Sequence, residues 1–102
     1  MIWKFSLKLL DRQTLILPKG SYILSVGYQP APSTASDIQL WAWVPPGTDA
    51  YWKEELRTEE RKIAILGTGS TAPGPNRRGI TFLGTVLMAG ALAWHVFLDG
   101  ER

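Results

Sequence analysis

The chain has 102 residues, which is the length of one domain. Of these residues, 45% are hydrophobic and 20% are charged, a composition that is typical of a globular protein and excludes a disordered one. Eleven Lys and Arg residues stand against nine Asp and Glu residues, and the net charge of +2 is too small to indicate nucleic-acid binding. The absence of cysteine excludes disulfides and thiolate chemistry and fits a reducing cytoplasm.

The first third of the chain predicts three β-strands. Residues 2–9 alternate strictly between apolar and polar side chains, so they predict a strand with Trp3 and Phe5 on its buried face. Residues 13–17 predict a second short strand, and residues 21–28, which are rich in aromatic and branched side chains, predict a third. Lysines interrupt the apolar run at the N-terminus, which argues against a signal peptide.

The middle of the chain predicts a fourth strand and then a helix. In the strand, residues 37–44, Trp41 and Trp43 project from the same face because they are two residues apart. Asp49 and the threonine before it are candidate N-caps for a short helix over residues 50–61. Glutamates alternate there with Lys and Arg, as on a solvated helix face.

The nineteen residues from Ile80 to Leu98 carry no formal charge, and two interpretations compete. As a helix they would be about 28 Å long, close to the thickness of a bilayer core. Two glycines, two threonines and a histidine weaken that interpretation, and Gly90 near the centre can adopt the positive φ of a hairpin turn. The composition therefore favours a hairpin of two strands, buried on both faces, over a membrane span.

Strand character also returns over residues 62–66, and the Gly- and Pro-rich residues 67–79 predict a loop. The expected fold is all-β: a small antiparallel sandwich or partly open barrel of six to seven strands, with one short helix between the fourth and fifth strands. Residues 1–102 are expected to form a single β domain. A small sheet with this much apolar surface has edges and faces to cover, which indicates a homo-oligomer.

Seven short motifs follow one another along nearly the whole chain: IWKF, QTL, LPKGSYILSV, LWAWV, GTG, FLGTV and ALAWHVF. Their order resembles a family of small proteins of unknown function that occur mainly in bacteriophages and prophages. Two segments depart from that family, since residues 48–60 are longer and more charged and the loop after Gly69 is unusually rich in Pro and Gly. Ser70 stands where family members often have histidine, so no role of that histidine transfers. The resemblance implies origin and supports the hairpin, but it implies no activity.

The segment GTGST, residues 67–71, follows a predicted strand and suggests a phosphate-binding loop. Pro73 and Pro75 prevent the helix that a dinucleotide-binding fold would start there, and the lysine of a P-loop is absent. Glycine-rich backbone can still present amides to an anion, and arginines can add planar cations; the opposing interpretation is a loop with solvated arginines. With two tryptophans as an aromatic wall, the candidate ligand-binding residues are Gly67, Thr68, Gly69, Ser70, Arg77, Arg78, Trp41 and Trp43.

Other side chains have a competing structural role. Paired strand aromatics such as Trp41 and Trp43 more often belong to a core. Trp52, in the charged segment, is the candidate for an exposed contact, and His95, inside an apolar strand, indicates a core or interface residue. One histidine and no cysteine argue against a zinc site, and no spacing nominates a catalytic triad. We therefore expect interface roles for Trp52 and His95, and no catalytic residue, metal, cofactor or enzymatic activity.

These features favour a non-enzymatic, phage-type binding protein in the cytoplasm of the host cell, which counters host defence by sequestering a small anionic, nucleotide-like ligand. One alternative is an inhibitor that blocks a host defence complex by protein contact, as anti-CRISPR proteins do. Another is a virion or assembly component whose activity is self-association. The expected partners are copies of the chain, a small anionic ligand or a host defence protein, and not a membrane or a nucleic acid.

Overall fold

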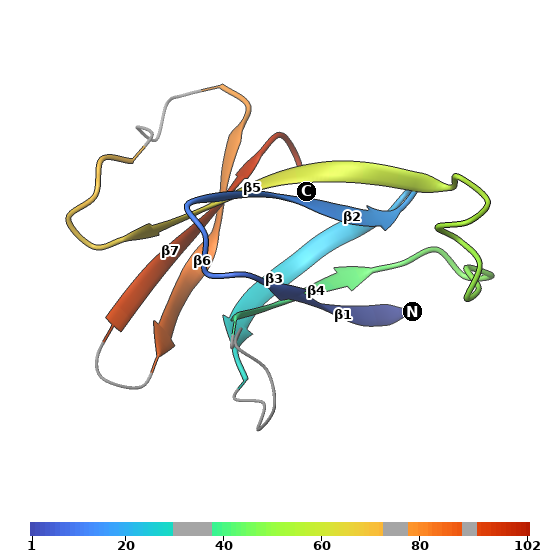
Figure 1. The fold of residues 1–102 in the computed structure, drawn as a ribbon, viewed down its shortest axis with the longest axis horizontal. Helices are drawn as coiled ribbons and strands as arrows, with labels where there is room; N and C mark the ends of the chain where they lie inside the picture. Colours follow the sequence, from blue (N-terminus) through green and yellow to red (C-terminus); the bar gives the residue numbers. More distant parts are fainter. Residues whose placement is uncertain (30–37, 73–77, 89–91) are drawn as a thin grey trace.

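The computed structural model describes residues 1–29, 38–72, 78–88 and 92–102. These residues contain seven β-strands and no helix, so the all-β prediction is confirmed (Figure 1). The strands are β1 (Ile2–Leu7), β2 (Arg12–Pro18), β3 (Tyr22–Tyr28), β4 (Ile38–Trp43), β5 (Thr58–Gly67), β6 (Ile80–Met88) and β7 (Leu92–Asp99).

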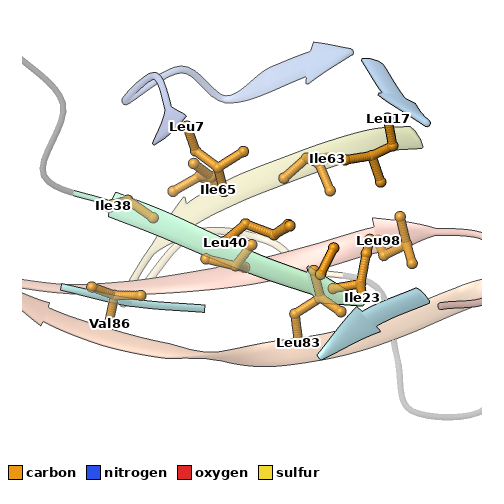
Figure 2. Packing of buried hydrophobic residues seen from close by; sticks show 12 residues of the cluster. Leu7, Leu17, Ile23, Ile38, Leu40, Ile63, Ile65, Leu83, Val86 and Leu98 are labelled. Carbon is orange, nitrogen blue, oxygen red and sulfur yellow. The ribbon is translucent and has the colours of Figure 1, made fainter. Parts of the chain in front are cut away.

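The strands form two antiparallel sheets. The three-stranded sheet has the order β1-β4-β3, and the four-stranded sheet has the order β2-β5-β7-β6. The described strands do not close into a barrel, because each sheet keeps its own pair of edge strands. The main hydrophobic cluster takes side chains from both sheets, which makes the architecture a sandwich with the core between its layers (Figure 2).

Alternation along each strand decides which side chains fill the core. In β4, Leu40 and Ala42 are completely buried, and in β7 Val96 and Leu98 are completely buried. Trp3 and Phe5 lie half-buried on the inner face of β1, as the alternation predicts. The twelve residues of the core cluster are Leu7, Leu17, Ile23, Ile38, Leu40, Ala42, Ile63, Ile65, Leu83, Val86, Val96 and Leu98. Burial of each large aliphatic side chain stabilises the fold by about 1.5–3 kcal/mol.

The uncharged segment near the C-terminus is a hairpin, as predicted. β6 and β7 pair antiparallel, and their register begins with Ile80 opposite Asp99. The predicted turn residue, Gly90, lies outside the described residues. No helix in the described residues is long and apolar enough to cross a membrane.

The prediction that this hairpin is buried on both faces is wrong. β6 is an edge strand, and only its inner side chains, such as Leu83 and Val86, contact the core. On its other face Phe82 is 50% exposed, and Leu87 in the same strand is 69% exposed. Apolar residues at both alternating positions therefore do not require a second covering layer here.

The predicted helix over residues 50–61 is also wrong. The N–H of Tyr51 donates to Asp49 Oδ1 (2.9 Å), so a capped turn does begin where expected. It ends after one turn at Leu56, whose φ of 57° is left-handed and incompatible with a continuing helix. β5 begins at Thr58, four residues before the predicted start at residue 62, and takes the remaining charged residues into the four-stranded sheet.

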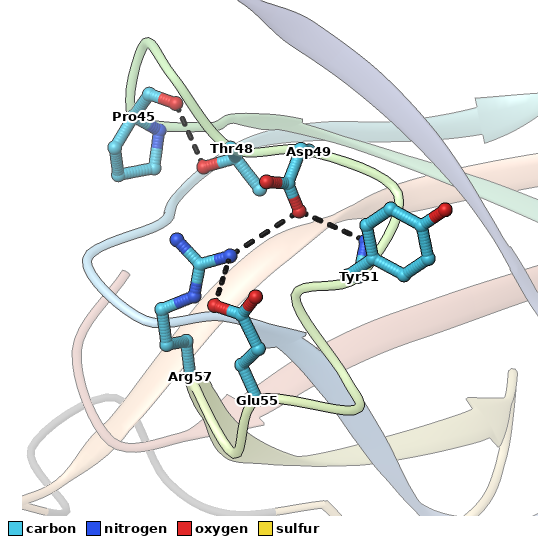
Figure 3. A network of polar contacts seen from close by, with 6 residues as sticks. All are labelled: Pro45, Thr48, Asp49, Tyr51, Glu55 and Arg57. Atoms are coloured by element: carbon cyan, nitrogen blue, oxygen red, sulfur yellow. Dashed lines mark hydrogen bonds and ion pairs between the residues drawn. The ribbon is translucent and has the colours of Figure 1, made fainter.

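A small polar network holds this turn (Figure 3). Arg57 contacts the carboxylates of Asp49 (3.2 Å) and Glu55 (2.9 Å), and the Thr48 hydroxyl donates to the Pro45 carbonyl (2.8 Å). The Arg57 side chain is 45% exposed, so the surrounding water weakens both ion pairs. The network orients the connection between the two sheets and adds little to their stability.

The edge strands β3 and β6 lie side by side and join the sheets along one seam. The ladder of β3 shifts after Ile23, and that of β6 shifts after Phe82, so both strands bulge. The guanidinium of Arg102 donates to the carbonyls of Ile23 (3.3 Å), Leu24 (3.1 Å) and Phe82 (3.4 Å). One side chain therefore bonds carbonyls of both bulged strands and ties the two sheets together.

Candidate ligand-binding site

The outer face of the four-stranded sheet brings side chains from four strands into two adjacent rows. Residues opposite one another in the ladders share a face, and the faces alternate along each strand. The first outer row is Arg12, Ala64, Phe97 and Phe82. The second outer row is Thr14, Lys62, Asp99 and Ile80.

A hollow of about 500 Å³ lies over these rows. The loop after β5 forms one wall through Thr71 and Ala72. The polar side chains of the two rows that line the hollow are Arg12, Thr14, Lys62 and Asp99. Its apolar lining consists of Ala64, Leu66, Ile80 and Phe97. Pockets for small molecules have a similar volume and a similar mixture of apolar lining and a few polar groups.

Three charged side chains lie at this hollow. Lys62 stands directly opposite Asp99 in the ladder, and Arg12 is the diagonal neighbour of Lys62, at roughly 7–8 Å between such positions. Within the described part of the chain, none of the three makes an ion pair. The hollow thus has two cations at its β2–β5 side and one carboxylate at its β7 side.

The predicted glycine loop adjoins this hollow, and one of its amides is used inside a turn. Gly67 is the last residue of β5, and the Ser70 N–H donates to its carbonyl (3.1 Å). Gly69 has a φ of 94°, which closes the turn. The Ser70 amide is therefore used inside the turn. Arg77 lies outside the described residues, and Arg78 is exposed just before β6.

The predicted tryptophan wall lies on the other sheet. Trp41 and Trp43 project from the outer face of β4, opposite to the core-facing Leu40 and Ala42, so their assignment to the core is wrong. Trp43 is 41% exposed, and the Trp41 ring lies over Gly27, where a Cβ would be 3.2 Å from it. The structure does not bring these tryptophans together with the glycine loop.

The two candidate interface residues have different surroundings. His95 lies on the outer face of the four-stranded sheet, where its Nε2 is 2.9 Å from Thr68 Oγ1 and its Nδ1 is 3.0 Å from Thr85 Oγ1. A catalytic triad would place a carboxylate where Thr85 stands. In the described residues, no group of three His, Cys, Asp or Glu side chains could hold a metal ion.

Trp52, by contrast, is predicted to be exposed but is only 8% exposed. Its ring lies 6.4 Å from the ring of Trp3, and Lys53 Nζ lies 5.2 Å from its centroid. The turn after β4 folds Trp52 back against β1, since an indole loses contact with water by covering another aromatic ring. Its surface is therefore not available for a partner.

Most of the residues that line the hollow are not recognisable from the sequence. Arg12, Lys62, Phe97 and Asp99 occupy unremarked positions in three strands, and only pairing brings them together. One signal was present: Lys62 and Ala64, and likewise Phe97 and Asp99, are two residues apart and must share a face in a strand. Which strand lies beside which is not encoded in that periodicity.

The comparison with protein families places the whole chain in one of them. Residues 1–102 match the model of DUF7352, a domain of unknown function. No match was found to a curated protein or to a solved structure. The match over all residues shows that the chain belongs to the DUF7352 family.

Proposed function

We propose that the protein is a non-enzymatic binding protein that captures a small anionic ligand in the hollow of its four-stranded sheet. The observation that carries the proposal is the hollow itself, with its apolar floor and two cations at one side. A guanidinium binds a carboxylate or phosphate through paired N–H groups, and a neighbouring ammonium adds a second charge. Apolar surface at Ala64, Leu66 and Phe97 gives the rest of a ligand a place to leave water.

This site differs from the one expected from the sequence alone. The cations come from β2 and β5 instead of the loop, and the aromatic surface comes from Phe97 instead of Trp41 and Trp43. Arg78 keeps a supporting role in the proposal, because it is exposed at the end of the loop whose beginning lines the hollow. A phage origin and the sequestration of a defence signal stay predictions, as does action inside a host cell.

The test is a thermal-shift and calorimetric screen of small phosphates and carboxylates with three single variants. Arg12→Gln and Lys62→Gln each remove one cation from the hollow and are expected to weaken binding about tenfold. Lys4→Gln is the matched control, because it makes the same charge change on the outer face of the other sheet. Equal affinity in all three variants, or no ligand among the anions, would contradict the proposal.

A fourth variant separates the hollow from the loop. Arg78→Gln is expected to weaken binding by about twofold, since an exposed cation near the site contributes through screened attraction only. If Arg78→Gln weakened binding more than Arg12→Gln does, the anion would bind at the loop that the sequence predicts and not in the hollow.

A second candidate function is protein contact through the three-stranded sheet. Ile2, Trp43 and Tyr22 are neighbours across β1, β4 and β3, and they are 65%, 41% and 52% exposed. An exposed apolar row of this kind is typical of an interaction surface. It is the surface that a homo-oligomer, an assembly component or a direct inhibitor of a defence complex would use.

Sedimentation across a range of protein concentrations tests self-association. Trp43→Lys is expected to abolish any dimer, because it places a charge at the centre of the row. Leu87→Lys, at an exposed apolar position on the other sheet, is the control and is expected to leave the dimer intact. If the wild-type protein stays monomeric at every concentration, self-association is ruled out. The apolar row would then have to contact a different protein for this second function to hold.

A further inference from the structure

The proposed anion site explains two of the three charges at the hollow and leaves Asp99 without a role. This inference rests on the proposed function and concerns the chemical class of the ligand. Asp99 stands directly opposite Lys62 and two residues from Phe97 on the same face. A carboxylate only accepts hydrogen bonds, so beside a purely anionic ligand it would repel.

The hollow has open space beside Phe97. On one side Phe97 contacts Phe82, with ring centroids 5.3 Å apart and planes inclined by 55°, and this contact holds its orientation. On the other side its ladder partner is Ala64, which has only a methyl group. Because the Ala64 side chain is small, the hollow is open above it, and the ring of Phe97, which packs against Phe82, borders this open space.

The distances between the strands fit a ligand with two polar ends. Arg12 is on β2 and Asp99 is on β7, with β5 between them. Neighbouring strands lie about 4.8 Å apart and residues two apart in a strand lie about 6.7 Å apart, so the Arg12 and Asp99 positions are about 12 Å apart across the sheet, whereas Lys62 is directly opposite Asp99. A nucleoside monophosphate has its phosphate and the far edge of its base at opposite ends of a similar length.

We propose that the ligand is a nucleoside phosphate whose base presents two adjacent N–H donors, as guanine does. The phosphate lies between Arg12 and Lys62, the base lies over Ala64 beside Phe97, and Asp99 accepts from the ring N–H and the exocyclic amino group. Adenine offers one donor beside a ring-nitrogen acceptor, and that acceptor would meet the carboxylate oxygen unfavourably. The carboxylate therefore selects the base while the cations hold the phosphate.

Titration calorimetry with guanosine, inosine and adenosine monophosphates tests this order. Inosine monophosphate has the ring N–H but no 2-amino group, so it is expected to bind about tenfold more weakly than the guanosine compound, and adenosine monophosphate more weakly still. Asp99→Asn replaces one acceptor by a donor. It is expected to remove the preference for guanosine monophosphate and to favour xanthosine monophosphate, whose base has a carbonyl in place of the amino group.

Two controls separate this inference from the proposed function. Ribose 5-phosphate carries the anion without a base, and Arg12→Gln removes the anion contact from every ligand. If all the monophosphates bind equally and depend on Arg12, the anion site is upheld and the guanine inference is overturned. If no monophosphate binds, or if binding ignores Arg12, the proposed function falls as well. Circular dichroism of both variants verifies that these exposed substitutions leave the fold intact.

Discussion

The two outer faces of the sandwich cover the same core but differ in their chemistry. Strands β1, β3 and β4 carry a single charged residue, Lys4, and their outer face has a row of exposed apolar side chains. On the outer face of the other sheet, strands β2, β5 and β7 carry four charged residues, which are Arg12, Glu60, Lys62 and Asp99. Removing the exposed apolar side chains of the first face from water, by contact with another protein surface, would lower the free energy. The charged side chains of the second face can instead make directional contacts with ligand groups of opposite charge.

The largest expected effect tests the division between inner and outer faces. Leu40→Ala removes a side chain that is 0% exposed at the centre of the core, and it is expected to lower the free energy of unfolding by about 3 kcal/mol. Leu87→Ala makes the same change at a position that is 69% exposed, and it is expected to cost about 0.5 kcal/mol. Urea unfolding measures both, and equal costs would show that the faces are assigned wrongly.

The seam that holds the two faces together is expected to be the next most sensitive point. Gly84 has a φ of 156°, and a Cβ there would lie 3.0 Å from Val26 Cγ2 across the seam. Gly84→Ala is therefore expected to destabilise the fold by about 2 kcal/mol through backbone strain and overpacking. Gly47→Ala is the control, since Gly47 also has a positive φ of 88° but nothing within 4 Å.

Denaturant midpoints of these two glycine variants sharpen the comparison. Strain alone is expected to cost about 1 kcal/mol in Gly47→Ala. If Gly84→Ala were no less stable than Gly47→Ala, β3 and β6 could move apart to accept the methyl group without loss of stability. The packing between the two sheets would then contribute less to stability than the short distance between Gly84 and Val26 indicates.

Salt separates the two faces by mechanism. Ligand binding at Arg12 and Lys62 is expected to weaken several-fold when salt rises from about 50 to about 500 mM, because exposed charges are screened. Self-association through the apolar row on the three-stranded sheet is expected to change little or to strengthen. Calorimetry measures ligand affinity and sedimentation measures self-association, both in the same buffers. If salt instead weakened self-association and left ligand affinity unchanged, the proposed mechanisms of the two faces would be wrong.

The smallest expected effect lies in the turn between β4 and β5, which links the two sheets. Leu56 is 86% exposed and left-handed, so its side chain adds strain without burying apolar area. Leu56→Asn is expected to raise the free energy of unfolding by about 0.5 kcal/mol, since asparagine tolerates this backbone conformation. Leu56→Ala keeps the strain and is expected to change nothing. A gain in both variants would attribute the effect to loss of the exposed leucine instead.

Alternation and composition together were sufficient to predict most of the strands. They placed β1, β3, β4 and the β6–β7 hairpin correctly, because a period of two and the preference of branched and aromatic residues for strands are local properties of the chain. The helix predicted over residues 50–61 is wrong, because Glu, Lys and Arg favour a helix only where nothing else in the fold opposes it. Two features oppose it here: the backbone of Leu56 is left-handed, and Glu59 pairs with Leu17 in the ladder.

The candidate site was harder to predict than the fold. The segment GTGST, which begins at Gly67, is a recognisable local motif, and Arg78 follows it in the same Gly- and Pro-rich stretch of the sequence. Arg12 and Asp99 are separated by almost the whole chain, and they lie at one hollow only because β5 pairs with both β2 and β7. A ligand site built across three strands leaves no local motif.

The sequence by itself determined that the chain is all-β, that its uncharged segment folds back on itself, and that Leu40 and Ala42 share a face opposite to Trp41. Each of these properties depends on backbone geometry within a few residues. Only the tertiary structure decided which of those faces is buried, which strands are neighbours and where the charges gather. Those outcomes depend on packing between segments far apart in the chain, where the free energy of the whole core outweighs every local preference.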